Sequence, residues 1–435
     1  MDAKLIVDEV RLTPILISDP PLLNVQGVHQ PLTPRLVVEV ITRGGVSGLG
    51  ETYGDGVYLD LARPLAEALP GRPVTDMNGL FALAEETDPH RSAPAAGEEG
   101  VDAGGLRGVR TADKLRLSVV SAFETACLDA LGKTLGLPVH ALLGGKVRDT
   151  VEYSAYLFYR WAAHPGADTP EPADDWGPAL DPAGIVAQAR RFDRAYGFRS
   201  FKLKGGVFEP EREIAAIRAL AEAFPGRPLR LDPNGAWSVE TSLAVAHELS
   251  DVLEYLEDPA SGTDAMAEIA ARTDVPLATN MCVTTFEEVP EAFAKGAVRI
   301  VLCDHHYWGG LGRTRELAAL CRTYGVGLSM HSNTHLGISL AAMTQVAATL
   351  PELHHACDTH YPWQTEDVVT TRPVFRDGRL AVSDAPGLGV DLDRAALAAL
   401  HRRWLDDDGT HRDRDDAAAM RVADPEWHTP KIPRW

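Results

Sequence analysis

The hydrophobic pattern of the chain changes in character near residue 151. The segment before it opens with two stretches of strand composition, KLIVDEVRLTPI and RLVVEVITRGGVSGLGETYG. Apolar residues at three- and four-residue steps then indicate helices near residues 58–69, 76–87 and 113–136. These elements predict a small α+β unit over residues 1–150.

Strand-like and helix-like runs alternate after residue 151. The eight strand-like runs are VEYSAYLFY, SFKLKGG, PLRLDPNGAW, VLEYLEDPA, VPLATNMC, VRIVLCDHHYW, VGLSMHSNTH and LHHACDTHYPW. Eight strands separated by helices favour a closed parallel (β/α) barrel of the TIM type. An open doubly wound sheet is the competing architecture, but it usually carries a Gly-rich phosphate loop after its first strand, and we find none. We therefore expect an α/β protein with a barrel over residues 151–390, and loops at 88–108 and 162–181.

Each expected barrel strand ends in a polar residue. These residues are Lys202 with Lys204, then Asp232, Glu257, Asn280, Asp304, His331 and His360. From Lys204 onward they follow one another at steps of 23 to 29 residues, which is the length of one strand, one helix and two short loops. The carboxyl ends of barrel strands converge on one mouth, where barrel enzymes do their chemistry. We therefore expect one pocket to hold all of these side chains.

Composition excludes some classes of partner. The net charge of −20 argues against nucleic acid and against an anionic membrane surface. The five cysteines form no CxxC pair, which suits a reducing compartment. We see no signal peptide and no run of 18 apolar residues, so we expect a cytoplasmic protein without a membrane span.

Three strand-end residues offer oxygen ligands for a metal ion. Asp232, Glu257 and Asn280 stand on three consecutive strands. Hard oxygen ligands favour Mg²⁺, with Mn²⁺ as a substitute, over zinc. Three protein ligands leave coordination positions for water and a bidentate substrate. We interpret the trio as a magnesium site.

The remaining strand-end residues suit acid–base chemistry beside that ion. Lys202 can hold a substrate carboxylate, and Lys204, next to a second ammonium and a metal, can act as a neutral base. Asp304 can fix the tautomer of His331, which would approach from the opposite side of the barrel. This arrangement suits abstraction of the proton α to a carboxylate, followed by racemisation or by loss of a β-hydroxyl.

The motifs resemble the enolase superfamily, mandelate racemase subgroup, and within it the glucarate dehydratase family. The resemblance is carried by GLGE at 48–51, SAFETACLDALGKTLGLPVHALLGG, FKLKGG, LRLDPNGAW, LEDP, ATNM, MHSNTHLGISL, DTH, PGLGV at 386–390 and RDRDDAAAM. Asn280 is the sharpest mark, because most relatives place Glu there. The resemblance implies a capping domain at 1–150 and a segment at 391–435 that returns to the cap and covers the barrel mouth.

The resemblance also implies roles for individual residues. It implies Lys204 and His331 as the two bases, with Asp304 orienting His331. The substrate-binding residues that it implies are His29, Thr111, Tyr156, Lys202, Asn280, His331, Ser332, Asn333, His360 and Arg414. Arg414 or His29 would meet the distal carboxylate of a hexarate dianion. The implied reaction is dehydration of D-glucarate, and also of L-idarate, to 5-dehydro-4-deoxy-D-glucarate by a homo-oligomer.

Other readings stay open at this stage. The same base pair would serve a dehydratase or epimerase of another hexarate or aldonate, and a new keto group in the product separates the two reactions. A regulatory barrel without activity is a different class, although every expected catalytic group is present. An unrelated metal-dependent sugar isomerase would bring more ligands for a second metal ion.

Overall fold

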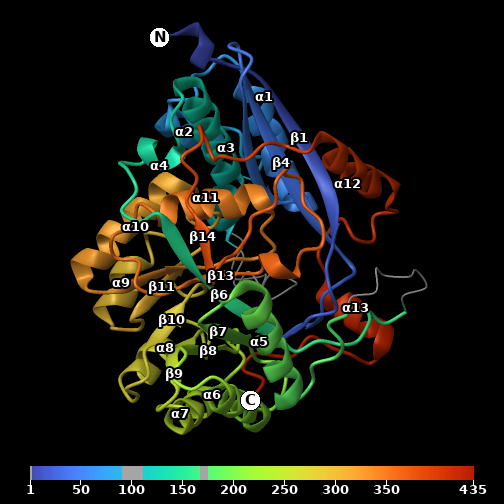
Figure 1. Cartoon of the computed structure of the whole chain (residues 1–435), viewed down its shortest axis with the longest axis vertical. Helices are drawn as coiled ribbons and strands as arrows, with labels where there is room; N and C mark the ends of the chain where they lie inside the picture. The colour runs from blue at the N-terminus through green and yellow to red at the C-terminus, as the bar shows by residue number, and fades with distance from the viewer. Residues whose placement is uncertain (1, 91–110, 167–174) are drawn as a thin grey trace.

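A computed structural model describes residues 2–90, 111–166 and 175–435, and Figure 1 shows an N-terminal part above a barrel. The N-terminal part holds an antiparallel sheet of three strands in the order β1-β4-β5. Its strands and helices are η1 (Ala3–Leu5), β1 (Val7–Ser18), β2 (Leu23–Asn24), β3 (Gly27–Val28), β4 (Leu32–Thr42), β5 (Ser47–Tyr53), α1 (Gly56–Ala68), α2 (Met77–Glu86), α3 (Ala112–Leu135) and α4 (Val139–Leu142). The α+β unit and its three helices are confirmed, and the expected loop at 88–108 lies mostly outside the described residues.

Strand β5 packs directly against helix α3, and the glycines of the GLGE stretch make this possible. A Cβ atom on Gly50 would lie 1.9 Å from the carbonyl oxygen of Ala122, and one on Gly48 would lie 2.0 Å from that of Ala126. Only glycine allows such a close approach of strand and helix backbones. The contact fixes the position of β5 on α3, and therefore the place of Glu51 between the cap and the barrel.

The barrel strands lie in the order β12-β11-β10-β9-β8-β7-β6-β13, and neighbouring strands are parallel. They are β6 (Thr150–Phe158), β7 (Phe201–Lys204), β8 (Leu229–Asp232), β9 (Leu253–Glu257), β10 (Leu277–Thr279), β11 (Ile300–Cys303), β12 (Gly327–Met330) and β13 (Cys357–Thr359). The helices between them are α5 (Pro182–Tyr196), α6 (Pro210–Ala223), α7 (Val239–Glu248), α8 (Thr263–Ala270), α9 (Val289–Ala294), α10 (Leu311–Tyr324) and α11 (Gly337–Ala347). A parallel bridge from Leu328 to Leu353 brings the two ends of the order together. The expected barrel of eight strands is confirmed.

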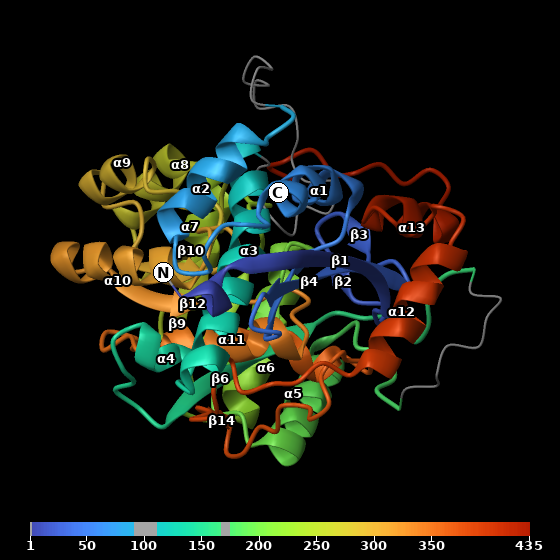
Figure 2. The same cartoon turned by 90° about the horizontal axis from the view of Figure 1, so that it is seen from above.

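The chain returns to the cap after the barrel. A short 3₁₀ helix, η2 (Tyr361–Trp363), and strand β14 (Arg379–Ala381), which pairs antiparallel with β6, were not expected from the sequence. Helix α12 (Arg394–Asp406) then packs along β1, and α13 (Asp416–Ala423) lies beside β3, as Figure 2 shows. The last residues lie against the barrel, where the carbonyl oxygen of Trp435 accepts a 2.6 Å hydrogen bond from the backbone of Ser238. This path brings Arg414 to the boundary between cap and barrel.

One large hydrophobic core runs through both described parts of the chain, from the cap sheet to the helices around the barrel. A smaller apolar cluster, Tyr255 with Ala278, Ile300 and Leu302, fills part of the barrel interior. Among the described residues, no helix is both long and apolar enough to cross a membrane.

Candidate active site

The polar residues expected at the strand ends stand where the sequence places them. Lys204, Asp232 and Glu257 are the last residues of β7, β8 and β9, whereas Asn280, Asp304, His331 and His360 directly follow β10, β11, β12 and β13. All of these side chains are buried. Because parallel strands end at one face of a barrel, the set surrounds one mouth, and the cap covers it.

The two lysines lie among carboxylates. Lys202 Nζ is 2.7 Å from Glu257 Oε1 and 2.7 Å from Asp358 Oδ2, and it lies 4.5 Å above the ring of Tyr156. Burial alone would lower the pKa of Lys202, but Asp358 and Glu257 outweigh it and hold that pKa well above its ordinary value. Lys204 Nζ donates to Asp232 Oδ2 at 2.8 Å and to Asn234 Oδ1 at 2.7 Å.

The backbone after Lys204 explains the glycine pair that follows it. Gly206 has φ of +72°, and a Cβ atom there would lie 2.3 Å from the carbonyl oxygen of Pro233. The buried Glu213 carboxylate accepts the backbone N–H groups of Gly206, Val207 and Phe208. This turn pins β7 against the loop after β8, so Lys204 stays beside Asp232 and Asn234.

The candidate metal ligands have the chemistry that a hard divalent cation needs. Burial and the nearby Asp232 carboxylate hold the pKa of Glu257 well above its ordinary value, and Glu257 Oε2 lies 2.6 Å from Lys202 Nζ. Asn280 donates from its amide nitrogen to Glu257 Oε1 at 3.1 Å. Two carboxylates and a side-chain amide supply the hard oxygen donors that Mg²⁺ prefers, and the charge of the ion would offset the repulsion between the carboxylates.

Asp304 and His331 form a carboxylate–imidazole pair. His331 Nδ1 lies 3.2 Å from Asp304 Oδ2, and both side chains are buried. Burial opposes the charge on Asp304, but the imidazoles of His306 and His331 outweigh it and hold the pKa of Asp304 well below its usual range. Burial lowers the pKa of His331, although Asp304 acts in the other direction. The imidazole is therefore biased toward its neutral, basic form.

A small pocket opens between the barrel mouth and the cap. It is lined by His29, Tyr156, Phe158, Lys204, Ser332, Asn333, Thr334, His360 and Arg414. The rings of His29 and His360 are stacked with centroids 6.2 Å apart, and neither Nε2 atom has a hydrogen-bond partner among the residues that the structure describes. Burial lowers the pKa of His360 to about 3. The pocket therefore presents one amine, one guanidinium and two imidazoles with unused nitrogens.

Six of the ten substrate-binding residues expected from the sequence line this pocket, whereas Thr111, Lys202, Asn280 and His331 do not. Thr111 is exposed, and its hydroxyl accepts from the backbone N–H of Lys114 as the N-cap of α3. Lys202 lies beneath the pocket among its carboxylates, while Tyr156 donates from its hydroxyl to Asp232 Oδ2 at 3.2 Å. The position of Thr111 is explained by helix capping alone.

Several residues at the mouth were missed by sequence reasoning. Asp19 lies 3.2 Å from His29 Nδ1 and 3.5 Å from Arg414 Nη1, so one carboxylate orients two pocket residues. Asp358 holds Lys202 from below, and Asn234 holds Lys204. Asp358 and Asn234 could have been found from the sequence, because the motifs DTH and DPNG place them beside strand ends. Asp19 lies in a loop far along the chain from Arg414, and no local pattern marks it.

Family comparisons cover both parts of the chain. Residues 9–144 match the N-terminal domain of mandelate racemase and muconate lactonizing enzyme, and residues 184–396 match the enolase C-terminal domain-like family. A probable glucarate dehydratase of Streptomyces coelicolor is 74% identical over 435 residues, which is 100% of both chains. The L-talarate/galactarate dehydratase of Salmonella typhimurium is 25% identical and aligns with 89% of this chain and 86% of its own length.

Solved structures of similar proteins match nearly the whole chain. An enolase from Thermobispora bispora complexed with magnesium and formate has a TM-score of 0.92 and 53% identity, covering 99% of this chain and 100% of its own. An enolase from Pseudomonas fluorescens with bound magnesium, potassium and tartrate has a TM-score of 0.92 and 46% identity, covering 99% of both chains. The chain therefore belongs to the enolase superfamily, in the mandelate racemase subgroup, and within it to the glucarate dehydratase family. It is a carbon–oxygen lyase of the hydro-lyase class.

Proposed function

We propose that this enzyme dehydrates D-glucarate to 5-dehydro-4-deoxy-D-glucarate, acts on the C5 epimer L-idarate through its second base, and depends on Mg²⁺, with Mn²⁺ as a substitute. The observation that carries the proposal is the pocket that Lys204 lines together with His29, His360 and Arg414, with the Asp232 carboxylate 2.8 Å from the Lys204 amine. A dianionic sugar acid needs a base at its α carbon and cationic groups at both carboxylates. Its relative from Streptomyces coelicolor, named a probable glucarate dehydratase, supports the same substrate.

Asp232, Glu257 and Asn280 would hold the metal ion, and magnesium in two similar structures supports this choice. Bound there, the ion supplies positive charge for the substrate carboxylate as negative charge develops on it. Lys202 adds a fixed positive charge, because Asp358 and Glu257 keep it protonated. With the ion bound, Glu257 and Asp232 would face both it and Lys202, so their negative charges would offset part of the positive charge.

His331 and Lys204 are the two bases that remove a proton from the substrate carbon. His331 takes the proton from C5 of D-glucarate, and the electron pair of that C–H bond moves into the adjacent carboxylate as an enediolate. The bond from C4 to its hydroxyl then breaks, and a proton from the imidazolium of His331 accompanies the leaving oxygen as water. The resulting enol loses the proton of its C5 hydroxyl, gains a proton at C4 and becomes the 5-keto product. Lys204 would remove the C5 proton of L-idarate, which points to the other face.

The distal half of the substrate lies toward the cap. Arg414 and His29 line that side of the pocket, and both are held by Asp19. A guanidinium can bind a carboxylate through two parallel hydrogen bonds, which selects hexarates over aldonates. Ser332 and Asn333, in the loop after β12, offer polar groups for the hydroxyls between the two carboxylates.

Product analysis tests the proposed substrate. The purified enzyme with Mg²⁺ is incubated separately with D-glucarate, L-idarate, galactarate and gluconate, and the α-keto product is trapped with semicarbazide and measured by its absorbance. We expect semicarbazone from the first two acids only, with the double variant Lys204→Met/His331→Asn, which lacks both proposed bases, as an inactive control. Product from galactarate or gluconate in place of D-glucarate would move the proposal to another acid sugar. Epimerised substrate without any keto acid would replace dehydration by racemisation.

A further inference from the structure

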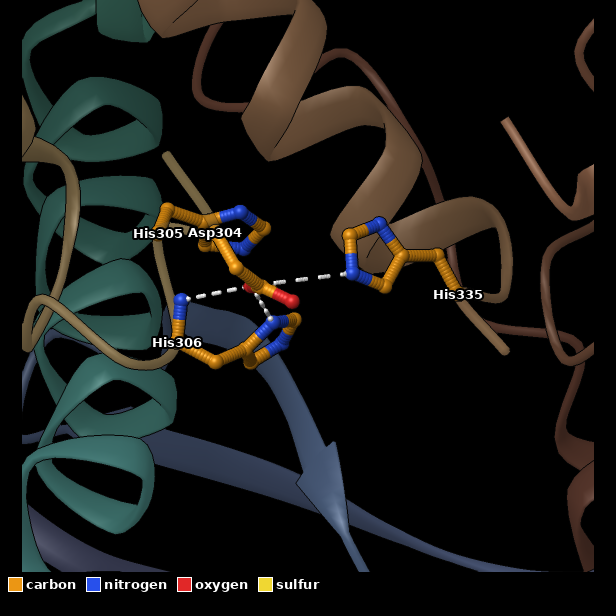
Figure 3. Close-up of side chains that lie close together, drawn as sticks. All are labelled: Asp304, His305, His306 and His335. Atoms are coloured by element: carbon orange, nitrogen blue, oxygen red, sulfur yellow. Dashed lines mark hydrogen bonds and ion pairs between the residues drawn. The ribbon is translucent and has the colours of Figure 1, made fainter. Parts of the chain in front are cut away.

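His306 holds the carboxylate of Asp304 from the side opposite to His331. Its ring nitrogen Nδ1 lies 2.8 Å from Asp304 Oδ1, and its backbone nitrogen donates to the same oxygen at 3.0 Å. The other oxygen, Oδ2, is the one that His331 Nδ1 approaches at 3.2 Å. Figure 3 shows the His306 ring and backbone both meeting Asp304. His306 therefore holds Oδ1, while Oδ2 lies between His331 and the Tyr53 hydroxyl, which donates to it at 3.4 Å.

The other nitrogen of His306 reaches the cap. Its Nε2 lies 3.0 Å from the backbone carbonyl oxygen of Glu51 and 3.1 Å from Ser339 Oγ. The Glu51 side chain accepts the backbone N–H groups of Leu336 at 2.9 Å and Ser339 at 3.0 Å. One imidazole thus joins the Asp304–His331 pair to the end of β5 and to the first turn of α11. All of these groups are buried.

The neighbouring histidines do not share this role. His335 Nε2 is 3.9 Å from Asp304 Oδ1, which is too long for a hydrogen bond. The ring of His305 packs on that of His306 with centroids 4.1 Å apart, but within the described part of the chain its Nδ1 has no hydrogen-bond partner. Asp304, His305, His306 and His335 place their ligand atoms close enough together to suggest a metal site. Because Asp304 and His306 already bond each other and their other atoms have protein partners, we interpret the cluster as a support for Asp304.

We propose that His306 is a positioning residue that sets the Asp304 carboxylate for His331 and ties this pair to the cap. The proposal rests on the proposed function, in which His331 serves one face of the substrate and Lys204 the other. Lys204 has separate supports, Asp232 and Asn234. Loss of the His306 bond to Asp304 should therefore affect proton transfer on the His331 face and spare the Lys204 face.

Two amide substitutions distinguish the hydrogen bond made by Nδ1 of His306 from those made by its Nε2. The amide nitrogen of His306→Asn falls near the place of Nδ1 and can still donate to Asp304, whereas that of His306→Gln falls near Nε2 and reaches only toward Glu51 and Ser339. His305→Gln is the matched control, since His305 is an adjacent buried histidine without a bond to Asp304. Thermal unfolding of each variant reports whether the fold is kept.

Exchange of the C5 proton with D₂O is measured by proton NMR for D-glucarate, which faces His331, and for L-idarate, which faces Lys204. We expect His306→Gln to slow the initial exchange of D-glucarate roughly tenfold or more, the effect of losing a hydrogen bond to a charged group. Exchange of L-idarate should stay within about twofold, and His306→Asn and His305→Gln should stay near wild type. Equal losses for both epimers, or none in His306→Gln, would overturn the proposal.

A second readout needs no substrate. In protein with ¹⁵N-labelled histidine, the Nδ1 proton of His331 is assigned by its disappearance in His331→Gln. We expect this signal to shift or broaden in His306→Gln and to persist in His306→Asn and His305→Gln. An unchanged signal in His306→Gln would overturn the positioning role whatever the activity. Absence of exchange with both acids in the wild type would instead count against the proposed substrate, so the two failures are distinguishable.

Discussion

Lys204 Nζ lies 2.8 Å from Asp232 Oδ2, which pairs a candidate base with a candidate metal ligand. The two residues are partners in the register between β7 and β8. Lys202 approaches the same carboxylate oxygen at 3.4 Å. A cation bound by Asp232 would draw the carboxylate away from both amines. Metal binding would therefore change the contacts that both lysines make with Asp232.

Removal of the amide ligand should weaken metal binding. We expect Asn280→Ala to raise the dissociation constant for Mg²⁺ roughly tenfold or more, because one of three protein ligands is lost. Isothermal titration calorimetry measures the constant, and Asn78→Ala, an exposed position in α2, is the control. An unchanged constant would remove Asn280 from the ligand set.

The two bases should be separable by substrate epimer. We expect Lys204→Met to lower C5 proton exchange from L-idarate on the order of 10³-fold, because no other base faces that proton. His331→Asn should do the same for D-glucarate. Initial exchange rates in D₂O measure both effects. Retention of full exchange in either variant would contradict the assignment of that base.

The pH dependence should reflect the buried state of His331. Burial lowers the pKa of His331 from its ordinary value of 6.5. Because the neutral imidazole is the base, kcat/KM for D-glucarate is lost only when the pH falls through that lowered value. We expect the acid limb of the kcat/KM profile to lie below pH 6.5. A limb at or above pH 6.5 would mean that His331 is not the titrating base.

Arg414 should set the preference for dianionic substrates. We expect Arg414→Ala to lower kcat/KM for D-glucarate by about 10- to 100-fold, with most of the change in KM, because a charge-assisted contact to the distal carboxylate is lost. The exposed Arg421→Ala is the control. Steady-state kinetics with D-glucarate and gluconate measure the ratio of specificities. An unchanged ratio would place the distal carboxylate elsewhere.

Stability should depend on pH through Glu124, which joins α3 to α10. Its two carboxylate oxygens accept the backbone N–H groups of Leu311 and Gly312. Burial raises the pKa of Glu124 from 4.5 to about 7, although the two N–H groups act in the other direction. The folded state then binds the proton more tightly, so this contribution is complete below about pH 4.5 and is lost as the pH rises to about 7.

The variant Glu124→Gln isolates that contribution. We expect the free energy of unfolding of the wild type, minus that of Glu124→Gln, to fall by up to about 3 kcal/mol between pH 4.5 and pH 7. Urea unfolding at several pH values measures the difference. Glu287→Gln, at an exposed position, should show no such slope. A flat difference for Glu124 would contradict the raised pKa.

The barrel and the strand-end residues could be predicted from the sequence because both depend on local periodicity. Each strand is a short apolar run, and each candidate ligand or base stands at its carboxyl end, so spacing alone places Asp232, Glu257 and His331 at one mouth. The expected candidate ligands Asp232 and Glu257 are brought together around Lys202, at 3.4 Å and 2.6 Å. Their role as metal ligands stays a prediction.

The cap side of the site could not be predicted from patterns, because its contacts join segments far apart in the chain. Asp19 meets Arg414 across 395 positions, and Glu51 accepts from the first turn of α11. Strand β14 is another example, since it pairs with β6 only after the barrel is complete. Only the family resemblance pointed to His29 and Arg414 as substrate-binding residues. The N-cap role of Thr111 could be predicted from its position at the start of a helix.

We propose that the site removes a proton α to a carboxylate with the help of a divalent metal ion. The most direct measurement is incubation of the purified protein with D-glucarate and Mg²⁺ in D₂O, with and without a chelator, followed by proton NMR. We expect 5-dehydro-4-deoxy-D-glucarate to form, with C5 exchange in recovered substrate, and both to stop when the chelator is added. Product formation that is unaffected by the chelator, or the absence of both exchange and product, would contradict the claim.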